Sequence, residues 1–145
     1  MFKHILIPTD GSALSNIAVT GGVKLAQDLG ARITGLTVTP PFHVLAVETM
    51  QDLDSPEQYS AKAQALAARN LEALKTAALA AGVSCELVHC VGEHPYEAIV
   101  STAQERGCDV ILQASHGRRG MGALIIGSET NKVLTHTKIP VLVFR

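Results

Sequence analysis

Short runs of aliphatic residues alternate along this chain with longer segments whose apolar residues recur at helical spacing. A run that is apolar at every position is typical of a strand buried on both faces of a sheet. Five such strands are expected, at 5–7, 33–38, 85–91, 110–113 and 141–144. Helices are expected in the amphipathic segments between them, to about 29, from 56 to about 81, from 95 to near 107, and from about 128 to 136.

The first predicted helix contains two adjacent glycines, Gly21 and Gly22. Each costs about 1 kcal/mol relative to alanine within a helix, so close packing of this helix on the sheet is the expected reason for them. Ile17 and Ala18 belong to its predicted apolar face, and Gly30 is the predicted stop.

Strands and helices in strict alternation predict an α/β domain with a parallel sheet and helices on both faces. The expected architecture is a doubly wound, Rossmann-like sheet of five strands in the order 3-2-1-4-5, and residues 1–145 form a single domain. Ligands of such folds bind beyond the carboxyl ends of the strands, where the strand order reverses. Asp10, after the first strand, and the glycine-rich loop after the fourth are therefore expected to share one crevice.

The segment after the fourth strand has the composition of a phosphate-binding loop. Glycines lie between 117 and 127, and a Gly-Ser pair at Gly127 and Ser128 opens the next helix. Backbone N–H groups of such a loop, together with the partial positive charge of a helix N-terminus, hold anions. Two plainer interpretations stay open: Ser128 as a helix N-cap, which is compatible with phosphate binding, and Asp10 as a turn residue or cap.

The spacing from Gly117 through nine residues to Gly127 and Ser128 resembles the motif of the nucleotide-binding universal stress proteins, which is Gly, two residues, Gly, nine residues, Gly and Ser or Thr. The opening 5–12 and the ending 139–143 also resemble that family, so the resemblance covers the whole chain. The sequence departs from the motif at Ala114, where the family has its first glycine. A methyl group there is tolerable if the backbone φ is negative, and it weakens binding if a bare Cα must meet phosphate.

The resemblance implies a binding site for ATP, or for AMP or ADP. Pro8, Thr9 and Asp10 would line the adenine and ribose, and the backbone of Val38 would meet the adenine edge. The ribose and phosphates would be surrounded by Ala114, Gly117, Gly127, Ser128, Glu129 and Thr130. Asp10 and Glu129 could hold Mg²⁺ through the nucleotide.

The composition argues against several other classes of protein. Net charge is −1 and only 3% of residues are aromatic, which disfavours nucleic acid as a partner. The apolar runs are too short to span a bilayer, and no signal-peptide core precedes Pro8, so a cytoplasmic protein is expected. Three cysteines without metal-site spacing are expected to be reduced thiols, and the histidines show no ligand spacing, so no metal site is expected.

The resemblance implies a stress-response sensor or signalling module rather than an enzyme, because no catalytic constellation is recognisable. Two alternatives remain: a dimeric interaction protein of the family that no longer binds nucleotide, which Ala114 favours, and a slow ATP hydrolase that would use Asp10, Glu129, Arg118 and Arg119. A homodimer is expected through the apolar strand Val141 to Phe144, paired antiparallel with its twin at the sheet edge.

Overall fold

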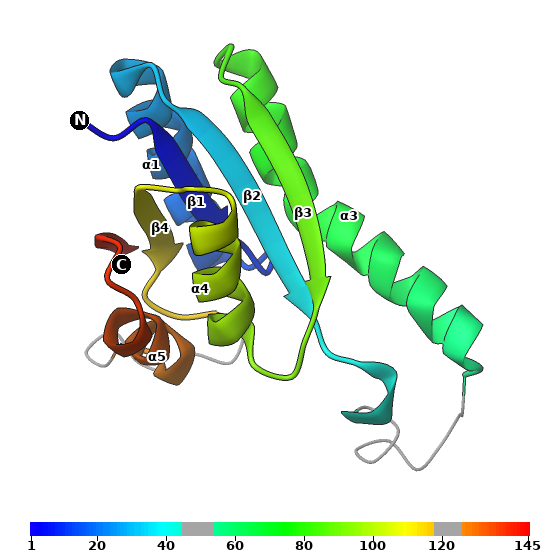
Figure 1. Ribbon diagram of the computed structural model, residues 1–145. Helices are drawn as coiled ribbons and strands as arrows, with labels where there is room; N and C mark the ends of the chain where they lie inside the picture. The colour runs from blue at the N-terminus through cyan, green and yellow to red at the C-terminus, as the bar shows by residue number, and fades with distance from the viewer. Residues whose placement is uncertain (45–53, 118–125) are drawn as a thin grey trace.

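The computed structural model describes residues 1–44, 54–117 and 126–145. Its described strands form one parallel sheet in the order β3-β2-β1-β4-β5 (Figure 1), which confirms the predicted order. The strands are β1 His4–Pro8, β2 Arg32–Thr39, β3 Cys85–Val91, β4 Val110–Ala114 and β5 Val141–Phe144. The order reverses between β1 and β4, so the carboxyl ends of these two strands flank the predicted switch point.

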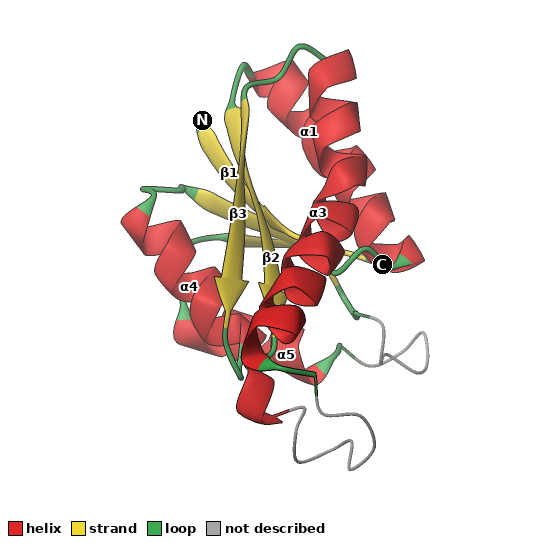
Figure 2. Cartoon of the chain, turned by 90° about the vertical axis from the view of Figure 1, so that its right-hand side faces the viewer, coloured by secondary structure: helices red, strands yellow, loops and turns green. Residues whose placement is uncertain are grey.

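Helices cover both faces of the sheet, as predicted. They are α1 Ala13–Leu29, α3 Pro56–Ala80, α4 Pro95–Glu105 and α5 Ser128–His136. Figure 2 shows α1 and α3 on one face and α4 on the other, and α5 packs on the α4 side. Of the helices in the described residues, none has the length and apolar character needed to cross a membrane.

Each face of the sheet has its own apolar cluster, because successive side chains of a strand point to opposite faces. Ile5 and Ile7 of β1 pack with Leu112 on the side of α1 and α3. Leu6, between them, packs with Ile111 and other side chains on the side of α4 and α5. All five are fully buried, and burial of such a side chain stabilises the fold by about 1.5–3 kcal/mol.

The glycine pair in α1 marks a close approach between helix and sheet. A Cβ on Gly21 would overlap the ring of Phe144, and one on Gly22 would lie 2.5 Å from Cδ1 of Ile7. The expectation of close packing is therefore confirmed. The expectation for Ile17 was wrong: its side chain is 52% exposed, whereas Ala18 is fully buried, because the buried face of α1 is centred on its small residues.

Polar caps and left-handed glycines, at 30, 82 and 107, mark where several helices begin and end. The hydroxyl of Ser12 accepts the N–H of Ser15 at the start of α1, and Gly30 follows its last residue at φ 60°, a conformation that favours glycine. Ser55 and Gln58 form a capping box at the start of α3. Gly30 is thus the stop that the sequence predicted.

Candidate functional site

The turn after β1 is held by hydrogen bonds within and beside it. The N–H of Thr9 donates to the carbonyl oxygen of Leu36 at 2.8 Å, the last link between β1 and β2. Gly11 has φ 75° and donates its N–H to Oγ1 of Thr9 at 3.1 Å. The N–H of Ser12 donates to Oδ1 of Asp10 at 2.9 Å. The turn thus holds the Asp10 carboxylate at the carboxyl edge of the sheet.

The start of α5 is tied to the end of β4 by main-chain and side-chain hydrogen bonds. The N–H of Gly127 donates to the carbonyl oxygen of Ser115 at 2.8 Å. The buried hydroxyl of Thr130 donates to the carbonyl oxygen of Ala114 at 3.1 Å. The N–H of Ser115 donates to Phe144 of β5 at 2.7 Å. These bonds fix the position of the α5 N-terminus relative to the sheet.

A side chain would be crowded at both glycines of the motif. A Cβ on Gly117 would lie 2.5 Å from Oδ2 of Asp10, and one on Gly127 would lie 3.0 Å from the carbonyl oxygen of Ser115. The distance at Gly117 is shorter than real Cβ atoms show, so Asp10 would have to shift, whereas the distance at Gly127 is at the tight end of real contacts. The turn after β1 and the loop after β4 therefore meet at Asp10 and Gly117, and a ligand crevice between them stays a prediction.

The N-terminus of α5 presents main-chain donors at this crevice. Gly127 is the N-cap and supplies no side-chain cap, while its carbonyl oxygen accepts the N–H of Asn131 at 2.9 Å. The N–H groups of Ser128, Glu129 and Thr130 have no acceptor within the helix, as in the first turn of any α-helix. Together with the helix dipole they form a donor set suited to an anion.

The main-chain groups of Val38 are directed toward the β1 side of β2. Along a strand, successive residues direct their N–H and C=O groups to opposite neighbours. The carbonyl oxygen of Leu36 bonds Thr9 on the β1 side, and that of Thr39 bonds Gly92 on the β3 side. Val38 therefore directs its main-chain groups to the β1 side, beyond the last bond between β1 and β2.

The side chains of Glu129 and Thr130 are engaged away from the expected phosphate position. Oε2 of Glu129 accepts the N–H of Tyr96 and Oε1 accepts Nζ of Lys132, both at 3.0 Å. The Thr130 hydroxyl is taken by β4, as described above. What these two residues present to the crevice is therefore their main chain.

Ala114, the departure from the motif, is the last residue of β4. Its strand backbone is extended, with negative φ, and it is only 8% exposed within the apolar cluster on the side of α1. The methyl group therefore contributes to the core. The negative φ is the backbone condition under which alanine is tolerable here, and the effect of the methyl group on nucleotide affinity stays a prediction.

A magnesium site made by protein groups alone does not fit the described residues, which contain no group of three His, Cys, Asp or Glu side chains able to hold a metal. The carboxylate of Glu129 is bonded to Tyr96 and Lys132, and that of Asp10 accepts the N–H of Ser12. The other phosphate ligands considered, Arg118 and Arg119, lie outside the described residues.

Sequence reasoning missed two parts of this site. One is Ser115, whose carbonyl oxygen holds Gly127 and whose hydroxyl lies 3.1 Å from Nδ1 of His116. The other is the link from Glu129 to Tyr96, 33 residues earlier. A main-chain acceptor and a contact between distant residues leave no mark on spacing or composition, so no pattern could have indicated either.

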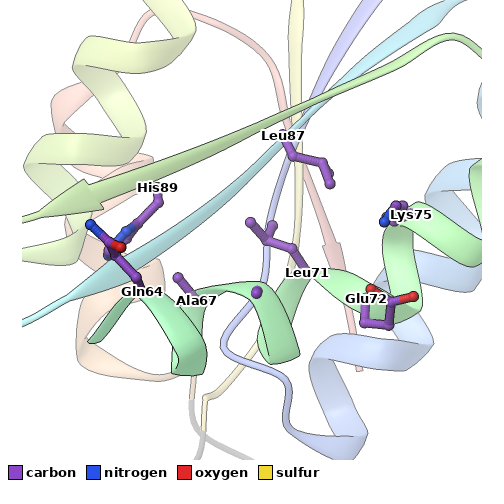
Figure 3. Close-up of a pocket in the computed structure, with 8 residues that line it drawn as sticks. Gln64, Ala67, Leu71, Glu72, Lys75, Leu87 and His89 are labelled. Atoms are coloured by element: carbon purple, nitrogen blue, oxygen red, sulfur yellow. The ribbon is translucent and has the colours of Figure 1, made fainter. Parts of the chain in front are cut away.

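A separate groove of about 350 Å³ lies between α3 and β3, away from this crevice. Figure 3 shows its lining, with Leu71 and Leu87 near the middle, Lys75 at one end, and Gln64 beside His89 at the other. Nε2 of His89 lies 2.7 Å from the hydroxyl of Thr39, and burial lowers the pKa of this imidazole. Unlike the crevice, the groove contains no helix N-terminus.

Comparisons with known proteins agree with the fold and with the motif. The model of the universal stress protein family matches residues 1–145. The universal stress protein YxiE of Bacillus subtilis is 30% identical over 151 aligned residues, which cover 100% of both chains. The solved structure of MJ0577, a universal stress protein of Methanocaldococcus jannaschii, has a TM-score of 0.83 at 28% identity and covers 99% of this chain and 96% of that one. A universal stress protein solved in complex with cAMP has a TM-score of 0.71 at 23% identity, with 99% and 97% covered.

Proposed function

The chain belongs to the universal stress protein family, and on that premise we propose that it binds an adenine nucleotide, ATP foremost and AMP or ADP as related forms. The proposed site is the crevice at the carboxyl ends of β1, β2 and β4. The observation that carries the proposal is the contact between Asp10 and Gly117, where the two expected halves of the site meet without room for a side chain. The cAMP complex of a protein with the same fold supports an adenine nucleotide as the ligand class.

Each side of the crevice has a separate task in this proposal. Pro8, Thr9 and Asp10 line the adenine and ribose, and Asp10 accepts a hydrogen bond from a sugar hydroxyl or the base amine. Val38 offers its main-chain N–H and C=O to the adenine edge, because they point past the end of β1. The phosphates lie against Gly117, Gly127 and the first-turn N–H groups of 128–130, where a helix N-terminus favours negative charge.

We assign the protein the role of a cytoplasmic stress-response sensor or signalling module, with no catalytic residue. Magnesium, where present, enters with the nucleotide phosphates, and Asp10 is the protein carboxylate that could meet it. The rival role of a family member that has lost nucleotide binding rested on Ala114. The burial of that methyl group in the core argues against this rival.

The test is to identify and titrate the nucleotide. Mass spectrometry of small molecules released from the purified, denatured protein should detect an adenine nucleotide. Calorimetry should give an ATP dissociation constant below about 1 mM, equivalent to about −4 kcal/mol. Gly127→Val should abolish binding, because Cβ at this position would already lie only 3.0 Å from the Ser115 carbonyl oxygen and valine adds two methyl groups to it. If the wild type binds no ATP at millimolar concentration, with and without Mg²⁺, the proposal is wrong.

We further propose a symmetric homodimer through β5. This strand pairs with β4 on one side and forms an edge of the sheet, and Leu142 is 39% exposed. The carbonyl groups of Pro140 and Phe144 bond toward β4, so the main-chain groups of Val141 and Val143 face outward. Antiparallel pairing with a second copy would satisfy these outward groups and cover the apolar edge.

A further inference from the structure

Glu129 lies in the first turn of α5, beside the proposed phosphate position, but its carboxylate contacts the neighbouring helix. Oε2 accepts the N–H of Tyr96 at 3.0 Å, and Oε1 accepts Nζ of Lys132 at 3.0 Å. Nζ of Lys132 also lies 5.3 Å from the centroid of the Tyr96 ring. The negative charge of Glu129 is thus held at the start of α4 and compensated by a lysine.

The start of α4 depends on this contact. Its N-cap residue His94 makes no side-chain cap hydrogen bond, and Pro95 follows as the first helical residue. The N–H of Tyr96 therefore needs an acceptor from outside the helix, and Glu129 supplies it. In Figure 1, α4 and α5 lie side by side, so Glu129 acts as a cap that one helix provides for the other.

The first turn of α5 is consequently attached in two directions. Thr130 bonds the carbonyl oxygen of Ala114 in β4, and the adjacent Glu129 bonds the main chain of α4. A helix held at one point can still turn about that point, whereas two attachments to different elements fix its direction. The direction of α5 decides where its first-turn N–H groups point, and these groups form the proposed phosphate donors.

We propose that Glu129 is a positioning residue for the nucleotide phosphates, acting through the orientation of α5 rather than through contact with the ligand. The inference rests on the proposed function. It has a second consequence, because a carboxylate released from Tyr96 and Lys132 would lie near the phosphates and repel them. The hydrogen bonds of Glu129 to Tyr96 and Lys132, called the Glu129 tether below, therefore both align the donors and keep this negative charge at α4.

The experiment compares ATP with adenosine, which lacks phosphates, in calorimetric titrations of the wild type and three variants. Glu129→Ala removes the tether and should weaken ATP binding about five- to tenfold, the loss expected when a helix cap no longer holds. Its affinity for adenosine should stay within about twofold of the wild type. Glu129→Gln keeps an oxygen that can accept the N–H of Tyr96, so it should restore ATP affinity.

The matched control is Glu97→Ala. Glu97 lies in the first turn of α4 and accepts the hydroxyl of Tyr96 at 3.0 Å. This hydrogen bond does not involve α5. This variant should bind both ligands as the wild type does. In the ligand-free protein, the Tyr96 amide should exchange hydrogen faster in Glu129→Ala and at the wild-type rate in Glu129→Gln.

Two results would overturn this inference alone: ATP affinity unchanged in Glu129→Ala, or an equal loss for ATP and adenosine. The first would mean that α5 keeps its direction without the tether, and the second that the residue supports the fold in general. A wild type that binds adenosine and ATP equally would also overturn it, since no phosphate contact would then exist. A wild type that binds neither ligand would overturn the proposed function and this inference together.

Discussion

Substituting Gly117 by alanine tests the crevice by adding a single methyl group. The new Cβ would lie 2.5 Å from Oδ2 of Asp10, whereas ordinary contacts begin at 3.4 Å, so the carboxylate must move by about 0.9 Å. Oδ1 of the same group accepts the N–H of Ser12, and this bond limits how the carboxylate can turn. We therefore expect Asp10 to lose the position from which it contacts the nucleotide.

The size of the effect follows from the bond that would be lost. A hydrogen bond to a charged group contributes about 1.5–3 kcal/mol. Its loss corresponds to a dissociation constant for ATP that is roughly 10- to 100-fold larger. Thermal stability should change little, because Asp10 is only partly buried. Calorimetry with ATP and thermal unfolding measure the two quantities separately.

Two controls make this reasoning refutable. Gly92→Ala adds the same methyl group at the same edge of the sheet, but its Cβ would lie 3.9 Å from Val38, so ATP affinity should not change. In a protein that already carries Asp10→Ala, Gly117→Ala should cost little more, because the space is then open and the two effects are coupled. Wild-type affinity for Gly117→Ala, or fully additive losses in the double variant, would contradict the argument.

Three further predictions concern the edge strand, the departure from the motif and a buried histidine. Light scattering of the wild type should give a mass of about 30 kDa, that of two 15.3 kDa chains. Val143→Pro removes an outward N–H and should halve this mass without unfolding the chain, whereas Leu142→Pro removes an N–H directed at β4 and should also lower the melting temperature. A monomeric wild type would refute the dimer. Ala114→Gly should leave ATP affinity unchanged and cost about 1 kcal/mol of stability in chemical denaturation; tighter binding would show that the methyl group obstructs the ligand. Burial, assisted by Arg32 and opposed by Asp109, lowers the pKa of His4, so the unfolded chain binds more protons than the folded chain as the pH falls below about 6.5. The free energy of unfolding should therefore fall when the pH is lowered from about 7 to about 5, by at most about 1.4 kcal/mol per pH unit. An equal fall in His4→Gln would contradict this.

The bounds of helices and strands were predictable where turn-forming residues flank an apolar or periodic segment. The strands at 85–91 and 141–144 and the helix at 128–136 have the predicted bounds, because each is a periodic segment between turn-forming residues. The exposure of Ile17 was not predictable, because the rotation of α1 about its axis is set by close contacts of its glycines with Phe144 and Ile7. These partners are distant in sequence, and helical spacing alone allows several adjacent faces.

Some parts of the candidate site were likewise predictable from the sequence, and others were not. Convergence of Asp10 and Gly117 followed from topology, because the carboxyl ends of β1 and β4 must be neighbours in a sheet of this order. Val38 was included only through the family resemblance, and the alternation of main-chain groups along β2 supplies the physical reason for it. The tether of Glu129 was not predictable, since its partner is a main-chain N–H of another helix.

The donors at the α5 side of the crevice belong to the main chain, and this decides which residues the site requires. Glycine is the expected residue at 117 and 127, because a side chain would displace the Asp10 carboxylate at the first position and crowd the Ser115 carbonyl oxygen at the second. At 129 the backbone alone faces the crevice, so its side chain can serve another purpose, and in this chain it joins α5 to α4. A substitution at 129 can therefore change phosphate binding without altering any group that touches the ligand. Nucleotide affinity in this protein should accordingly depend on the packing of α4 against α5 as well as on the loop glycines.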